Sequence, residues 1–238
     1  MSGSVHRATL TSIRPLARDV IEYVLTLPAD DAQLSWRAGQ FISLTCGIRD
    51  DGQPLLRSYS IANRPGSGRV DLVVKLVEGG PASEWFRRIT VGEEVRFTGP
   101  MGFFVLDLQH AGDVLFAATG TGIAPIVPMV EETLGRDEAG RVHLHWGVRA
   151  EEDLFWQDAI ARLASPRLST VVTLSQPSPA WGGERGRISD RVLALAPSLA
   201  RPTFYLCGNG AMIKEVKAGL VARGVDRKRQ IRTEAFFD

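Results

Sequence analysis

The spacing of apolar residues differs between the first and the second half of the chain. Up to about residue 108 the apolar residues fall in short runs rich in β-branched and aromatic side chains, punctuated by Gly, Pro and Asp, and only one short helix is predicted, at residues 83–89. This pattern is typical of an antiparallel β-barrel or sandwich. The predicted strands lie at residues 6–13, 20–27, 40–48, 55–62, 70–77 and 94–99.

After Gly112 the pattern changes to an apolar strand, a turn and then an amphipathic helix. Val127, Val130 and Leu134 recur at helical spacing, and Gly224 follows the last helical pattern as a stop signal. Strands that alternate with helices predict a parallel sheet with helices on both faces. The predicted strands are 114–118, 142–148, 170–174 and 203–207, and the predicted helices that follow three of them are 151–164, 190–199 and 211–224.

A chain of 238 residues is long enough for two hydrophobic cores. We therefore assign the β-rich half and the half with alternating strands and helices to two separate domains. The stretch 108–113 reads as the linker. The prediction is an antiparallel β-barrel over residues 1–108 and an α/β, Rossmann-like domain over residues 109–238.

Composition narrows the classes of function. Apolar residues make up 44% of the chain and charged residues 23%, and 28 basic side chains against 27 acidic ones leave a net charge of only +1, which favours no nucleic-acid partner. The N-terminal residues lack the layout of a signal peptide and no apolar run is long enough to span a membrane, so we expect a soluble cytoplasmic protein. Two cysteines are too few for an iron–sulfur cluster, and His143 and His145 are interpreted as structural because no third metal ligand stands near them.

Two glycine turns in the second half carry the strongest chemical signal. Gly120-Thr121-Gly122 follows one strand and opens a helix, and Cys207-Gly208-Asn209-Gly210 does the same at the last predicted strand. Glycines let backbone amides approach a ligand, and a helix N-terminus offers unpaired N–H groups to phosphate. A single short glycine turn is weak support, but both turns would face the carboxyl edge of one sheet, where such sheets bind ligands. Together they predict a dinucleotide site.

Seven motifs in register extend this interpretation over nearly the whole chain. In order they are Arg57-Ser58-Tyr59-Ser60, Gly79-Gly80 with Ser83, Gly99-Pro100-Met101-Gly102-Phe103, Gly120 to Pro125, Gly147-Val148-Arg149, Cys207 to Met212, and Glu234-Ala235-Phe236. These motifs occur in a chain whose predicted order is a β-barrel followed by a Rossmann-like domain. The chain therefore resembles the ferredoxin–NADP reductase superfamily, which includes the reductases of multicomponent oxygenases.

The resemblance implies a flavin on the barrel. Arg57 would pair with the flavin phosphate, for which its bidentate donors are suited. Tyr59 would lie against the isoalloxazine ring, and Ser60 would bring its hydroxyl near flavin N5. Gly80 and Ser83 would contact the pyrophosphate at the start of the short helix, and Ser58 completes the motif. The expected cofactor is FAD, with FMN as the alternative.

The resemblance also assigns the nicotinamide side. Gly120, Thr121 and Gly122 would hold the pyrophosphate of NAD(P)H, and Cys207 would form the wall behind the nicotinamide ring. Arg149, Gly208 and Met212 complete the expected cofactor-binding set.

The end of the chain matches a further family feature, a glutamate two residues before an aromatic side chain that covers the flavin. Glu234 and Phe236 have this spacing, although Phe237 follows directly and is the alternative.

The implied reaction is hydride transfer from nicotinamide C4 to flavin N5, followed by release of single electrons. Ser60 and Glu234 would handle the associated proton, Phe236 would move aside, and Cys207 would complete the catalytic set. The expected partner is a separate iron–sulfur protein, either a ferredoxin or an oxygenase component. The reductase itself is expected to be a monomer.

Alternatives stay open at this point. Gln176 stands where relatives that use NADPH commonly carry arginine, which favours NADH, but Arg185 and Arg187 could supply the missing charge. The chain could also be a flavin reductase that releases reduced flavin. It could instead be a flavin subunit of a larger complex, like that of dihydroorotate dehydrogenase, although the cysteine cluster of those subunits is absent.

Overall fold

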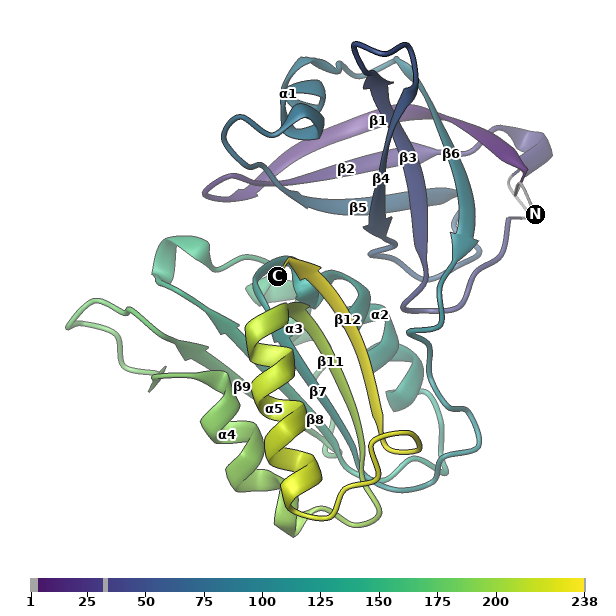
Figure 1. Cartoon of the computed structure of the whole chain (residues 1–238). Helices are drawn as coiled ribbons and strands as arrows, with labels where there is room; N and C mark the ends of the chain where they lie inside the picture. The colour runs from purple at the N-terminus through teal and green to yellow at the C-terminus, as the bar shows by residue number, and fades with distance from the viewer. Residues whose placement is uncertain (1–3, 32–33, 238) are drawn as a thin grey trace. The chain divides into compact units, whose positions relative to one another are not determined.

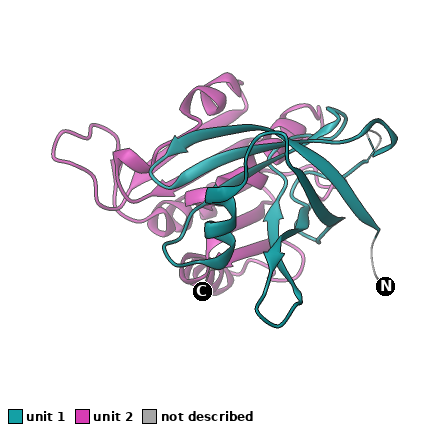
Figure 2. Ribbon diagram, turned by 90° about the horizontal axis from the view of Figure 1, so that it is seen from above, with its two compact units in different colours: residues 1–105 teal, residues 106–238 magenta. Residues whose placement is uncertain are grey.

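The protein is described here by a computed structural model covering residues 4–31 and 34–237. The chain forms two compact units, residues 1–105 and residues 106–238, each with its own core (Figure 2). The division falls three residues before the end that the sequence analysis gave to the first domain.

Unit 1 is a curled antiparallel sheet, as the sequence pattern predicted (Figure 1). Among its described residues the strand order is β4-β3-β6-β1-β2-β5. The edge strands meet just beyond β4, where the Ala62 amide donates to the carbonyl oxygen of Asp71 at 2.8 Å. The strands are β1 Val5–Ala17, β2 Val20–Thr26, β3 Phe41–Ile48, β4 Pro54–Ser60, β5 Arg69–Lys75 and β6 Glu94–Met101.

Alternation along the strands builds the core of unit 1. Ile42, Leu44 and Cys46 on β3 are buried while their neighbours are only half-buried, the period of two that a sheet with one covered face requires. Helix α1, Pro81–Arg88, adds Phe86 to the same core. The hydroxyl of Tyr23 in β2 donates to the carbonyl oxygen of Phe86 at 3.1 Å and so ties α1 to the strands.

Unit 2 is a mainly parallel sheet covered by helices on both faces (Figure 1). Within its described residues the strand order is β10-β9-β8-β7-β11-β12. The strands are β7 Val114–Thr119, β8 Val142–Val148, β9 Leu168–Leu174, β10 Glu184–Arg185, β11 Thr203–Asn209 and β12 Ile231–Phe237. The helices are α2 Ile123–Leu134, α3 Gln157–Arg162, α4 Ile188–Leu195 and α5 Gly210–Ala222.

Burial on both faces explains the apolar runs of the central strands. Every residue of β8 is buried, as are all of β7 except Thr119, because α4 and α5 cover one face and α2 and α3 the other (Figure 1). At the amino ends of the strands the carboxylate of Asp113 accepts from the amides of Arg141 and Ala200, both at 2.8 Å. The opposite, carboxyl ends carry the glycine turns.

Several elements differ from the sequence predictions, among them the two-residue strand β10, which was not predicted. The continuous helix predicted for residues 151–164 is wrong: a 3₁₀ turn, Glu151–Asp153, is followed by a short α3, and Trp156 between them has a left-handed φ of 54°. Strand β12 was not predicted. It forms by pairing with β11, from Phe204 opposite Ile231 onward, a partner that no local pattern reveals.

Candidate functional site

The Arg-Ser-Tyr-Ser motif lies on β4 and divides between the two faces of the sheet. Arg57 stands opposite Leu44 and Tyr59 opposite Ile42, so these two side chains share a face, while Ser58 and Ser60 share the other. Arg57 is exposed, and its guanidinium donates to the carbonyl oxygen of the preceding residue at 2.8 Å. Ser60 is buried.

Tyr59 meets helix α1 through an aromatic contact. Its ring lies edge-on to Phe86 with centroids 5.2 Å apart. Burial, and then the neighbouring Cys46, raises the pKa of the Tyr59 hydroxyl, so it stays protonated at physiological pH. Burial likewise raises the pKa of Cys46, to about 12. The contact fixes the tyrosine relative to the helix that carries Gly80 and Ser83.

The first turn of α1 has donors to offer an anion. Gly80 is the N-cap residue and provides no side-chain cap. The Ser83 hydroxyl accepts from the Val77 amide at 2.9 Å, which leaves its own hydrogen available for donation. An uncapped first turn, a serine hydroxyl and the exposed guanidinium of Arg57 are donors that suit a phosphorylated flavin such as FAD.

The two glycine turns of unit 2 pack on each other at the carboxyl edge of the sheet. A Cβ atom at Gly122 would lie 2.6 Å from the carbonyl oxygen of Cys207, and one at Gly208 would lie 2.4 Å from Thr119 Oγ1. The Thr119 hydroxyl also accepts from the Asn209 amide at 2.9 Å. The turns after β7 and β11 therefore form one structure, as a single dinucleotide site requires.

Gly120 differs from those two glycines. Its φ is 53°, and a Cβ atom there would have no heavy atom within 4 Å. The open space beside Gly120 leaves room for a ligand to approach the backbone. The turn Gly120–Gly122 leads directly into α2, whose N-terminus offers the partial positive charge that a pyrophosphate needs.

Asn209 and Thr119 organise this edge, and the sequence analysis did not select them. The Asn209 side chain caps α5 by accepting from the Met212 amide at 3.1 Å, and the Met212 side chain packs in the core of unit 2. Asparagine directly before a helical pattern is an N-cap signal that could have identified Asn209. Nothing in the sequence marks Thr119, whose partner lies 90 positions away.

Cys207 and Glu234 stand opposite each other on β11 and β12. Cys207 is completely buried, and burial, followed by the nearby carboxylate of Glu234, raises its thiol pKa well above the ordinary value. The thiol is therefore neutral, which suits a wall residue and not a nucleophile. Glu234 is partly exposed.

The aromatic residues at the C-terminus lie at a β-bulge of β12. Ala235 stands opposite Gly208 and Phe237 opposite Asn209, so Phe236 is the additional residue of the bulge. Phe236 is half-buried. The side chain of Phe237 lies outside the described residues, so the choice between the two phenylalanines stays as the sequence left it.

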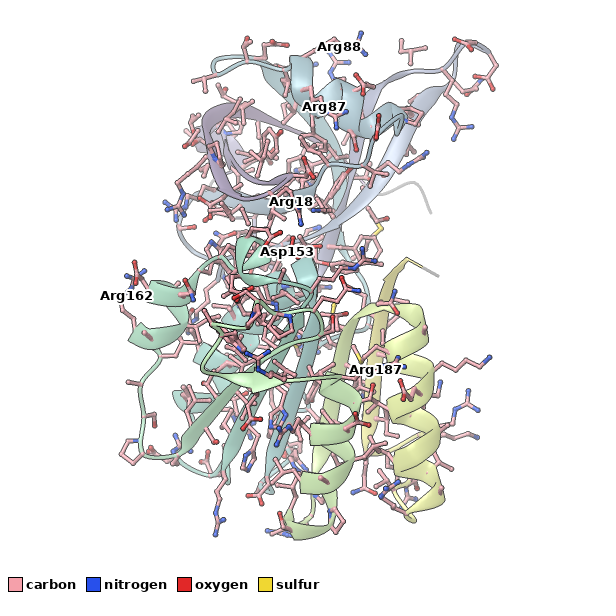
Figure 3. All side chains as sticks on the ribbon, turned by 90° about the vertical axis from the view of Figure 1, so that its left-hand side faces the viewer. Arg18, Arg87, Arg88, Asp153, Arg162 and Arg187 are labelled. Atoms are coloured by element: carbon pink, nitrogen blue, oxygen red, sulfur yellow. The ribbon has the colours of Figure 1, made fainter. Side chains whose placement is uncertain are left out.

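The basic residues near β9 have partners within unit 2. Arg185 donates to the carbonyl oxygens of Ser178, Pro179 and Trp181 at 2.7 to 3.1 Å. Arg187 lies at the start of α4 (Figure 3). It forms an ion pair with Glu215 of α5 at 2.8 Å. Gln176 is exposed just after β9, and its backbone N–H donates to the backbone carbonyl oxygen of Arg149. Arg149 is exposed too, just after β8.

The described part of the chain contains no group of three or more His, Cys, Asp and Glu side chains placed to hold a metal ion. Among its helices, none is long and apolar enough to cross a membrane.

Comparison with known proteins defines the class as a two-domain flavin oxidoreductase. Residues 7–106 match the oxidoreductase FAD-binding domain, and residues 116–218 match the oxidoreductase NAD-binding domain. The predictions of a barrel that binds FAD and an α/β domain that binds a nicotinamide dinucleotide are confirmed.

Individual relatives place the chain more closely. It is 36% identical over 226 residues to ferredoxin–NADP reductase B of Sorangium cellulosum, covering 91% of each chain. It is 33% identical to the ferredoxin–NAD(P)(+) reductase component of naphthalene 1,2-dioxygenase/salicylate 5-hydroxylase systems of a Ralstonia species, covering 76% of this chain and 56% of that one. The crystal structure of a cytochrome P450 reductase of Amycolatopsis is 29% identical, with a TM-score of 0.86 over 100% of this chain and 72% of that one.

The chain belongs to the ferredoxin–NADP reductase superfamily and is a flavin-dependent NAD(P)H oxidoreductase. Several relatives are longer proteins, of which the chain spans 49% to 64%.

Proposed function

We propose that this protein oxidises NADH, passes the electrons to FAD held by unit 1, and delivers them singly to a separate iron–sulfur protein. The observation that carries the dinucleotide site is the packing of the two glycine turns into one edge, with Gly122 directly against Cys207. When bound, FAD accepts electrons in pairs from a nicotinamide and can release them one at a time, which is the chemistry such a relay needs.

On unit 1 the proposed FAD ligands are the residues of the Arg57–Ser60 motif with Gly80 and Ser83. Arg57 binds the phosphates with its exposed guanidinium, and Ser83 adds its free hydroxyl hydrogen at the uncapped turn of α1. Tyr59, held edge-on by Phe86, presents its ring to the isoalloxazine. Ser60, on the other face of β4, donates its hydroxyl proton toward flavin N5.

On unit 2 the proposed dinucleotide ligands are Gly120, Thr121 and Gly122 for the pyrophosphate, with Gly208, Met212 and Arg149 beside them. Cys207 is a neutral wall behind the nicotinamide because its thiol stays protonated. Glu234, its neighbour on β12, holds or accepts a proton. Phe236, re-aimed by the bulge, covers the flavin until the nicotinamide takes its place.

The preference for NADH rests on the partners of the two arginines. Arg185 binds three loop carbonyl groups and Arg187 pairs with Glu215, so a 2′-phosphate would have to compete with these contacts for either guanidinium. Gln176 brings no charge. These contacts favour NADH, although one relative is named a ferredoxin–NADP reductase.

The proposed acceptor is a ferredoxin or an oxygenase component. Relatives at 29% to 36% identity carry names such as ferredoxin–NADP reductase and propane 2-monooxygenase reductase component. The monomeric state and the cytoplasmic location stay predictions from the sequence.

The decisive experiment is anaerobic reduction of the purified protein with NADH and, separately, NADPH, followed by the visible absorbance of bound flavin. We expect the flavin to bleach rapidly with NADH and at least about tenfold more slowly with NADPH at equal concentration, the effect of about 1.4 kcal/mol of discrimination. Equal or faster bleaching with NADPH would contradict the nucleotide preference.

Two further results would replace the proposed function. A colourless protein that reduces only added flavin would be a flavin reductase. A yellow protein that neither nucleotide reduces would be an electron-transfer subunit of a larger complex.

A further inference from the structure

Trp146 on β8 contacts the first glycine turn, Gly120–Gly122, through a hydrogen bond. It lies on β8 opposite Ala118, is completely buried, and donates its indole N–H to the carbonyl oxygen of Gly120 at 3.0 Å. Because side chains alternate along a strand, Trp146 occupies the face opposite to that of His145. The donor lies on β8 and the acceptor in the turn that directly follows the neighbouring strand β7, so the bond ties this turn to the sheet.

The planarity of the peptide group gives this bond a consequence for ligand binding. The carbonyl of Gly120 and the amide of Thr121 belong to one trans peptide, so they point in opposite directions. A donor that draws the Gly120 oxygen toward Trp146 turns the Thr121 N–H away from it. Gly120 has no side chain and a φ of 53°, and its carbonyl oxygen accepts from the Ile123 amide as well as from Trp146, so two donors orient this peptide.

A series of aromatic contacts fixes the indole ring itself. Phe155 lies edge-on to Trp146 at 5.1 Å between centroids, and Trp156 lies edge-on to Phe155 at 5.7 Å. Trp156 adopts a left-handed φ of 54°, which is uncommon for a bulky residue, and this conformation interrupts the predicted helix. The strained backbone therefore places the two rings that support Trp146.

The indole itself is completely buried although it borders a hollow in unit 2. Trp146 lines a cavity of about 450 Å³ between β9 and α3, together with residues such as Ile160, Leu168 and Val172. The contact with Phe155 and the bond to Gly120 hold the ring at the edge of this hollow.

We propose that Trp146 is a positioning residue for the dinucleotide: it orients the Gly120–Thr121 peptide so that the Thr121 N–H meets the pyrophosphate. This inference rests on the proposed function, which assigns the turn to the pyrophosphate. Trp146 touches neither the nicotinamide nor the flavin in this role. Its effect is therefore on binding and not on the hydride step.

The test compares two ligands on the flavin-loaded protein. ADP-ribose carries the pyrophosphate, and adenosine lacks it. Replacing Trp146→Phe removes the N–H donor, and we expect ADP-ribose affinity, measured by calorimetry, to fall about tenfold, as loss of a buried hydrogen bond implies. Adenosine affinity, measured by NMR titration, should change less than about twofold. The limiting rate of flavin reduction at saturating NADH should also change less than about twofold.

Trp36→Phe is the matched control. Trp36 donates an equivalent bond to the Asn63 carbonyl oxygen at 3.0 Å in unit 1, so its loss should leave both affinities unchanged. If Trp146→Phe does not fold, β-(3-benzothienyl)alanine at position 146 keeps the ring shape and removes only the donor. The same drop in ADP-ribose affinity is then expected.

Unchanged ADP-ribose affinity in a folded variant would overturn the positioning role, as would an equal loss for adenosine. A wild-type protein that NADH does not reduce and that does not bind ADP-ribose would overturn the proposed function as well, so the two failures are distinguishable.

Discussion

At the scale of single residues, the glycines of the nucleotide edge have different reasons to be glycine. From the sequence, Gly120 and Gly122 have the same explanation, access of a ligand to the backbone. Gly120 does have open space where a Cβ would lie, but Gly122 has the Cys207 carbonyl oxygen and the Gly208 Cα within 2.8 Å. The motif was visible in the sequence because two glycine turns each follow a predicted strand and open a helix. The contact was not, because it joins turns that are 85 residues apart in the chain, Gly122 and Cys207.

The different reasons give a prediction about stability. Gly122→Ala should lower the free energy of unfolding by about 2–3 kcal/mol, since its Cβ meets backbone atoms that cannot move independently of the strands. The measurement is urea unfolding, with ADP-ribose binding as a second readout. Gly135→Ala is the control, because Gly135 has a helical φ of −73° and a Cβ there would meet carbonyl oxygens at an ordinary 3.6 Å. It should be neutral or stabilising by about 0.5–1 kcal/mol. Equal effects of the two substitutions would contradict the packing argument.

At the scale of elements, one arginine closes the carboxyl end of α2. Arg167, just before β9, donates to the carbonyl oxygens of Leu134, Arg136 and Ala139 at 2.5, 2.9 and 2.8 Å. The last carbonyls of a helix have no partner within the helix, and a cation there also complements the helix dipole. Helix α2 begins at the glycine turn, so its position matters to the site.

Removing this cap should loosen α2. Arg167→Ala should cost about 2 kcal/mol of stability, because three carbonyl groups lose a charged donor while partly buried. Thermal unfolding measures the loss, and hydrogen exchange should show it concentrated in α2. Exposed Arg162 on α3 provides the comparison, and Arg162→Ala should change stability by less than about 0.5 kcal/mol (Figure 3). If both substitutions lowered stability by similar amounts, the loss would reflect a general effect of charge and not the capping of α2.

The elements also show what a sequence can predict. The regular strands and the amphipathic helices were found because burial imposes their periods of 2 and 3.6 on each segment separately. The break at Trp156 was missed because its left-handed backbone is held by ring contacts with Phe155 and not by a local breaker. Strand β12 was missed because its residues are polar around Arg232 and become a strand only against β11. Tertiary partners decided both cases.

At the scale of the whole molecule, the two units contain buried titratable groups of opposite kinds. In unit 1 burial raises the pKa of the Asp71 carboxyl, so acidification favours its folded form. In unit 2 His143 and His145 lie buried on β8, and burial lowers both pKa values, that of His145 to about 4 with help from His143 and Arg191. Nε2 of His143 and Nδ1 of His145 have no hydrogen-bond partner in the described structure. The two units should therefore respond differently to pH.

The sign for unit 2 follows from linkage. His145 titrates near its ordinary pKa of 6.5 when unfolded and near 4 when folded, so the unfolded state binds more protons between these values and folding weakens as pH falls. Between pH 7.5 and pH 5 the loss from His145 alone is about 2 kcal/mol. Pulse-labelling hydrogen exchange in urea can follow peptides from β8 and β2 separately. We expect the β8 midpoint to fall on acidification while the β2 midpoint does not. His145→Gln, which cannot titrate, should remove most of the shift, and a β8 midpoint that still falls by the full amount in this variant would assign the acid sensitivity to other groups.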